Sequence, residues 1–155
     1  MLLGQNIHIV PGIAPVDTTT TTVNTDVIGV KEYEAIEFVI SFGAITGDTV
    51  VATLTESTST TASGNAIAGK YRLSSAVGTD TMGAVTTLTT SGVTIAAGDD
   101  NKVLLIDVEP AALTAGYPYV FVELNPGASM TVCVVSAVVL LKPRYPQAVG
   151  ISAVD

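Results

Sequence analysis

The sequence predicts an all-β protein, specifically an antiparallel β-sandwich with an extended N-terminal arm. Its 155 residues are 48% hydrophobic and 13% charged, and the recurring Val and Thr favour pleated, half-buried surfaces. Apolar and polar side chains alternate in several runs. Turn residues separate these runs at intervals of roughly ten residues, which is typical of a sandwich. We expect a jelly-roll topology, with an immunoglobulin-like sandwich as the alternative.

The first predicted strand, residues 35–42, shows the clearest alternation. Its even positions are apolar and share one face, whereas Glu37 and Ser41 lie on the other. A helix would scatter the even positions around its axis. We expect Gly43 to end the strand and residues 46–48 to form the turn that leads to the next one.

The remaining elements follow the same logic. Residues 49–56 alternate like the first strand, and residues 103–108 are apolar on both faces, which predicts a central strand. Residues 109–116 suit a single helical turn, because Pro110 stands at its start and a Gly at its end. Pro143 should stop the last strand, since it cannot donate to a ladder. The other predicted strands are 66–73, 93–95, 117–124 and 130–142. A loop is expected at 57–65, and a loop, with one strand inside it as the alternative, at 74–91.

Two terminal segments are predicted to lie outside the sandwich domain, which we place at residues 25–146. Residues 147–155 form a small, polar tail that we expect to be flexible. Residues 1–24 combine apolar side chains with prolines and a run of threonines, so we expect an extended arm. The arm either covers its own domain or lies on a neighbouring subunit. Its candidate interface residues are Ile7, Ile9, Val10 and Ile13.

Composition and charge exclude several classes of protein. Six basic residues against 14 acidic ones, a net charge of -8, argue against binding to nucleic acid or to anionic membranes. The longest apolar run, residues 132–141, is half of the roughly 20 residues that a membrane-spanning helix needs. The first residues lack the basic and apolar regions of a signal peptide, and one Cys excludes a disulfide scaffold. We therefore expect a protein made in a reducing cytoplasm.

No pattern of catalytic or metal-binding residues is recognisable. The sole histidine, His8, has no Gly-flanked nucleophile beside it, and Cys133 lies in the most apolar run, where we expect a buried thiol. The triplet Asp99-Asp100-Asn101 has oxygen ligands but lacks the spacing of a calcium loop, so we interpret it as a turn. We expect no enzymatic activity, no cofactor and no metal.

The shortage of charge favours a structural or binding module. Ordinary domains carry about 25% charged residues, and this chain has 13%. Thr, Ser, Ala and Gly replace the missing charges, as they would on an exterior that meets other protein, because assembly interfaces are depleted in charge. Virion proteins, secreted β-lattices and adhesins share this composition.

The pattern resembles the capsid decoration, or cement, proteins of tailed bacteriophages, which are small head proteins. The resemblance spans roughly residues 25–146. The residues that carry it are YEAIEF at 33–38, LLIDV at 104–108, LTAGY at 113–117, YVFV at 119–122, the long strand 132–141 and KPRYP at 142–146.

The resemblance implies a structural virion protein that binds the outside of an expanded capsid and stabilises contacts between major capsid subunits. It implies a homo-oligomer, with a trimer favoured and a dimer as the alternative, and a terminal arm that reaches a neighbour. Arg144 and Tyr145 suit an interface by residue type, and they equally suit the end of the last strand. The alternatives are another virion component, such as a tail or head-tail adaptor protein, and a carbohydrate-binding or adhesin-like sandwich.

Overall fold

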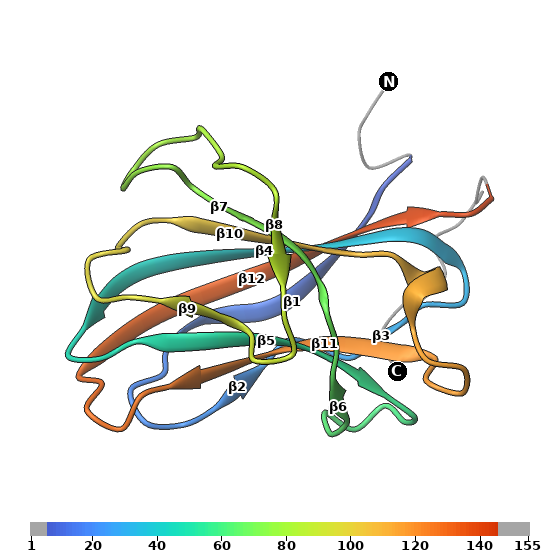
Figure 1. Cartoon of the computed structure of the whole chain (residues 1–155), viewed down its shortest axis with the longest axis horizontal. Coiled ribbons are helices and arrows are strands. Elements are labelled where there is room, and N and C mark those ends of the chain that lie inside the picture. The colour runs from blue at the N-terminus through green and yellow to red at the C-terminus, as the bar shows by residue number, and fades with distance from the viewer. Residues whose placement is uncertain (1–5, 146–155) are drawn as a thin grey trace.

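The structure, a computed structural model, describes residues 6–145 and consists of two antiparallel sheets packed face to face (Figure 1). The predicted β-sandwich is confirmed. Sheet A has the order β1 (His8–Asp17), β12 (Val132–Pro143), β4 (Tyr33–Thr46), β10 (Val103–Val108), β7 (Gly69–Leu73) and β8 (Thr86–Leu88). Sheet B has the order β2 (Val23–Asn24), β11 (Tyr119–Pro126), β5 (Val50–Ser57) and β6 (Asn65–Ala66), with β3 (Ile28–Gly29) beside β11 and β9 (Val93–Ile95) beside β5.

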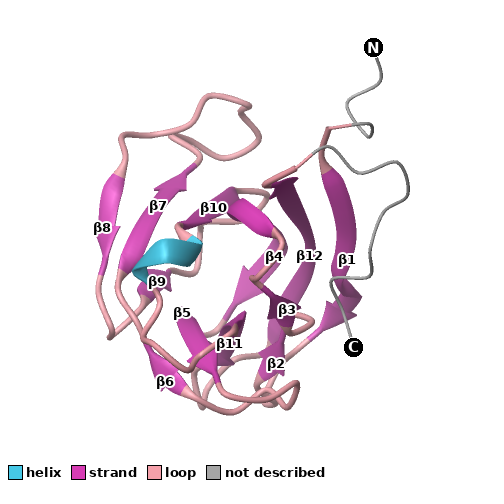
Figure 2. Cartoon of the chain, turned by 90° about the vertical axis from the view of Figure 1, so that its right-hand side faces the viewer, coloured by secondary structure: helices cyan, strands magenta, loops and turns pink. Residues whose placement is uncertain are grey.

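The two sheets enclose one core, and Figure 2 shows sheet A curving over sheet B from β8 to β1. Alternation along β4 places Phe38 and Ile40 inside, each 0% exposed. They lie opposite Ile106 and Leu104 of β10, which are equally buried. Matching period-2 patterns on neighbouring strands therefore fix the register, because a one-residue slip would turn the apolar side chains of the slipped strand outward.

Strand β4 is longer than the sequence predicts, because it continues through Gly43 to Thr46. A Cβ atom at Gly43 would lie 3.1 Å from the Cβ of Val134 on β12. The glycine therefore gives Val134 room on the neighbouring strand and does not break the sheet. The expected turn follows, with Gly47 at φ +100°, a conformation that favours glycine.

Asp48 joins this turn to the turn between β11 and β12. Its carboxylate accepts hydrogen bonds from the backbone N–H of Thr49 at 2.8 Å and of Ser129 at 3.1 Å. These bonds, first of all that from Thr49, lower the pKa of Asp48. Gly127 packs so closely on Asp48 that a Cβ atom there would overlap the carboxylate.

The predicted division at residue 24 is corrected by the structure, because most of the expected arm belongs to the sandwich. Residues 8–17 form β1, which pairs antiparallel with β12 of the same chain from His8 opposite Leu141 to Asp17 opposite Val134. Register shifts interrupt this pairing between Pro11 and Ile13 and again before Val16. Residues 23 and 24 form β2 of sheet B. The described part of the segment therefore completes its own domain.

The remaining predicted elements, namely one helical turn, one loop and the C-terminal tail, compare with the structure as follows. The helical turn at 109–116 is present as a short 3-10 helix, η2 (Pro110–Ala112). The loop predicted at 74–91 contains β8 and an isolated bridge between Ser74 and Met82. The tail at 147–155 lies outside the described residues, and the jelly-roll topology stays a prediction. In residues 6–145 no helix has the length and apolarity to cross a bilayer.

Candidate interaction surface

The outer face of sheet A, meaning the side that points away from sheet B, is apolar across four adjacent strands. On β12 the side chains at 133, 135, 137, 139 and 141 are buried, so the alternate ones point outward. Strand pairing places outward-pointing residues of neighbouring strands side by side. Pro11 lies opposite Val138, Val138 lies opposite Val39, and Val39 lies opposite Leu105. The apolar members of the outer face are Ile9, Pro11, Val39, Val103, Leu105, Val134, Val138 and Leu140.

These side chains remain partly accessible in the described chain. Ile9 is 53% exposed, Val138 41% and Val134 37%, and Val39 and Leu105 are half-buried. An antiparallel sheet with one face on a core usually presents polar side chains on its other face. Sheet A instead presents a largely apolar outer face, in which Ser136 and Ser41 separate Val134 from the apolar row of Val138, Val39 and Leu105. Exposed apolar surfaces of this kind mark sites of interaction.

A charged cluster borders the apolar residues at one end of the outer face. Asp107 of β10 lies directly opposite Glu37 on one side and Lys70 on the other. Arg72 lies in the next outward row, opposite Leu105, and its buried Nε atom has no hydrogen-bond partner. The charged cluster therefore holds two acidic and two basic side chains, with two carboxylates facing each other across neighbouring strands.

An open cleft of about 830 Å³ lies at the same end of the sandwich as the charged cluster. Its lining includes the outward side chains Glu37, Lys70 and Asp107. It also includes core side chains of both sheets, such as Ile36 and Leu54. The cleft therefore borders the outer face and reaches in toward the space between the sheets.

Glu37 carries an electrostatic cost in this position. Burial and, secondly, the Asp107 carboxylate raise its pKa above the ordinary value of 4.5, and Arg72 opposes them in part. Between the ordinary and the raised value the folded state binds more protons than the unfolded state. The contribution of Glu37 to stability is therefore present below pH 4.5 and lost as the pH rises through the folded-state pKa.

We expect the variant Glu37→Gln to be more stable than the wild type at pH 7, because glutamine cannot ionise beside Asp107. Urea unfolding at pH 7 and at pH 3.5, at low protein concentration, checks this. The difference between variant and wild type should shrink at the lower pH, where the wild-type carboxyl is protonated. Equal differences at both pH values, or a destabilised variant at pH 7, would contradict this account.

The predicted interface residues of the arm fall into two groups. Val10 and Ile13 are 5% and 8% exposed and belong to the core of their own chain, so they are not available to a neighbour. Ile9 points outward from β1 and belongs to the outer face of sheet A. Ile7 lines the cleft.

Arg144 and Tyr145 do not share one role. The Nε of Arg144 donates to the backbone oxygen of Tyr33 at 2.8 Å, and its backbone N–H donates to that of Glu32. Arg144 thus fixes the end of β12 to the start of β4. Tyr145 is 72% exposed, and its role in an interface stays a prediction. His8 contributes to the same junction, because its Nδ1 lies 2.9 Å from the hydroxyl of Tyr33.

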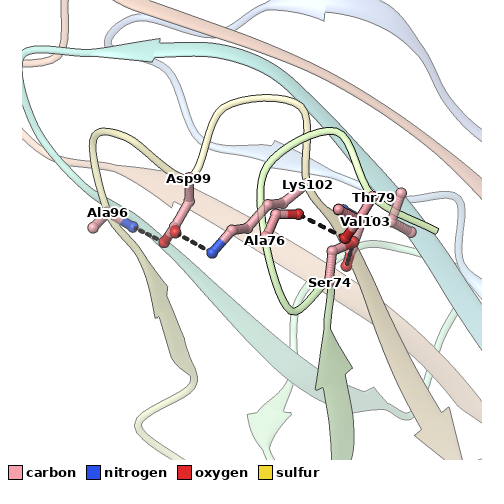
Figure 3. Close-up of polar contacts among 7 residues, drawn as sticks. All are labelled: Ser74, Ala76, Thr79, Ala96, Asp99, Lys102 and Val103. Atoms are coloured by element: carbon pink, nitrogen blue, oxygen red, sulfur yellow. Dashed lines mark hydrogen bonds and ion pairs between the residues drawn. The ribbon is translucent and has the colours of Figure 1, made fainter. Parts of the chain in front are cut away.

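The carboxylates of the triplet Asp99-Asp100-Asn101 form hydrogen bonds within their own turn and with the neighbouring strand β4. Asp99 contacts the Lys102 ammonium at 2.7 Å and the Ala96 N–H at 3.0 Å, while Asp100 accepts from Ile45 N–H (Figure 3 shows the Asp99 contacts). Burial raises the pKa of Asp99, but its bonds to Lys102 and Ala96 outweigh this and lower it. Within residues 6–145 no group of three or more His, Cys, Asp or Glu is arranged to hold a metal ion.

The loop that follows β7 is anchored beside this turn. Ser74 exchanges hydrogen bonds with the backbone of Val103, and the hydroxyl of Thr79 closes the loop on the oxygen of Ala76 (Figure 3). The two Ser74 bonds hold the start of β10 beside the end of β7, and the Thr79 bond lies within the loop.

Cys133 is buried at 0% exposure on β12. Burial, and then the Asp17 carboxylate, raise the pKa of its thiol, so the reactive thiolate is scarce. The Asp17 side chain also accepts a hydrogen bond from the Cys133 N–H at 2.9 Å. Both observations describe a structural thiol beneath the edge strand β1.

The comparisons with known proteins identify no relative. No protein-family model matches the chain, and no curated protein is detectably similar to it in sequence. Function must therefore be inferred from the surface itself.

The sequence analysis missed most of the outer face. Val39 and Leu105 lie on the faces opposite the predicted core positions, and Val138 and Leu140 lie in an apolar run without alternation, so none of them was recognised as part of a surface. The available signal was that residues 103–108 and 132–141 are apolar on both faces, which is typical of strands covered on both sides. In the described chain only the inner face of these strands is covered, by sheet B.

Proposed function

We propose that this protein is a structural virion protein that binds the outer surface of a phage capsid and stabilises contacts between major capsid subunits. The observation that supports the proposal most is the uncovered apolar face of sheet A. A largely apolar sheet face that no part of the described chain covers is suited to burial against other protein.

The charge balance fits a position on the capsid exterior. A net charge of -8 would repel packaged DNA, whereas neutral and weakly charged surfaces can pack on protein. The proposal includes assembly in the host cytoplasm, the major capsid protein as partner, and self-association of the chain. It assigns no catalytic step and no cofactor.

Co-sedimentation tests the proposed function. Purified protein is mixed with expanded, unexpanded and tail-bearing particles of the phage that encodes it, and the bound fraction is measured after centrifugation. We expect saturable binding to expanded heads. Binding to tails alone would favour a tail or adaptor component. Binding to glycans, with no binding to any of the three particles, would favour the adhesin-like alternative.

A further inference from the structure

We propose that the outer face of sheet A binds a second copy of this chain, so that two sandwiches pack through these faces about a two-fold axis. The inference rests on the proposed function in treating this face as an assembly surface, and it assigns the face to self-association, so that the dimer contacts the capsid through its other surfaces. It also specifies a dimer, because a surface that meets itself generates two-fold symmetry.

Charge favours a second copy as the occupant. The outer face holds Glu37 and Asp107 together with Lys70 and Arg72, which is a balanced set in a chain of net charge -8. Because each copy carries this net negative charge, contacts through most other parts of the surface would bring like charges together. The balanced, mostly apolar outer face is where they can approach without that cost. Its four charged side chains lie together at one end, which fits the polar rim of an interface around a core depleted in charge.

The edges of sheet A disfavour the other way of joining two sheets. Pro11 and Pro15 on the edge strand β1 have no N–H to donate to an added strand, and the register shifts beside them bend the edge. The opposite edge strand, β8, has three residues. Association is therefore expected face to face, in the way that sheets stack within sandwiches.

The size of the surface limits how stable the contact can be. The five strands β1, β12, β4, β10 and β7, over the outward rows from Val134 to Leu140, cover at most roughly 550 Å² at ordinary strand spacings, because β10 and β7 do not reach the row of Val134. A standard stable interface buries about 800 Å² per partner, and side-chain relief adds to the flat footprint. The contact thus approaches the lower end of stable interfaces, and we expect dissociation constants in the micromolar range.

Val138 is the position that tests the contact best, because it points outward from β12 near the middle of the apolar residues and is 41% exposed. The variant Val138→Lys places an ammonium group in the contact from both copies. Val77→Lys is the matched control, since Val77 is 50% exposed and lies in the loop after β7, outside the strands that form this face. Neither substitution removes a core side chain.

Sedimentation velocity over about 1–200 µM measures the outcome, a range centred on the affinity expected for this interface. Wild type and Val77→Lys should shift from 15.8 kDa to twice that mass, and Val138→Lys should raise the dissociation constant about 100-fold or more. Circular dichroism confirms that each variant is folded.

Three results would overturn the inference: a wild type that stays monomeric throughout, a trimer, or a dimer that Val138→Lys leaves intact. A persistent monomer would make residues 1–5 or 146–155 of the same chain the next occupant to test. Binding to expanded heads is measured on the same samples. A dimer without head binding refutes the proposed function alone, and head binding by a monomer refutes the second copy alone.

Discussion

Replacement of Phe38 by alanine is expected to lower the free energy of unfolding by about 3–5 kcal/mol. Phe38 is 0% exposed at the centre of β4, with β12 on one side and β10 on the other. Neighbouring strands cannot collapse into the space that its ring leaves, because their backbones are held by the ladder. A loss of this size is a large share of the about 5–15 kcal/mol by which domains are stable.

Urea or thermal unfolding followed by circular dichroism measures this effect. Val39→Ala is the matched control, because Val39 is the next residue on the same strand and points to the half-buried outer face. We expect the control to cost about 1 kcal/mol or less. Similar losses for both variants would mean that the two faces of β4 are equally enclosed, contrary to the structure.

Deletion of residues 1–17 is expected to remove a structural strand and not a dispensable arm. Strand β1 buries Val10 and Ile13 and covers Val139 and Leu141, which are 0% exposed. Losing two buried apolar side chains costs roughly 3–6 kcal/mol. The exposed β12 edge would also be free to pair with other chains, so we expect low stability and aggregation.

Size-exclusion chromatography and thermal unfolding of the truncated chain check this expectation. Two point variants separate packing from general disruption, since Val10→Ala should be clearly destabilising and Ile9→Ala, at 53% exposure, should be nearly neutral. A truncated protein as stable as the full chain would contradict this expectation and would support the interpretation of residues 1–17 as a dispensable arm.

Period-2 patterns predicted the inner half of the fold well, and their failures have physical causes. The predicted and observed bounds of β10 agree at 103–108, because Leu104, Ile106 and Val108 alternate without interruption. Strand β1 was missed because two prolines and the shift after Pro11 break the alternation, so the segment has the composition of an arm. Gly43 was misjudged because its role depends on a neighbour, Val134, that the local sequence does not contain.

The outer face could be predicted only in part, because a sequence pattern reports how buried a strand should be and not what buries it. Leu105 belongs to a run that is apolar on both faces, which indicates that both faces of the strand are covered. Sheet B covers one of these faces. The register that joins Val138, Val39 and Leu105 into one row depends on pairings between residues 99 and 66 positions apart, which local patterns do not reveal.

The central claim is that the outer face of sheet A is an assembly surface, and thiol labelling at position 138 tests it most directly. In a Cys133→Ala background, Val138→Cys carries the one thiol of the chain, and its rate of reaction with a maleimide is followed at increasing protein concentration and with expanded heads. The account predicts fast labelling of dilute protein and strong protection on assembly. An unchanged rate in every assembled state would contradict it.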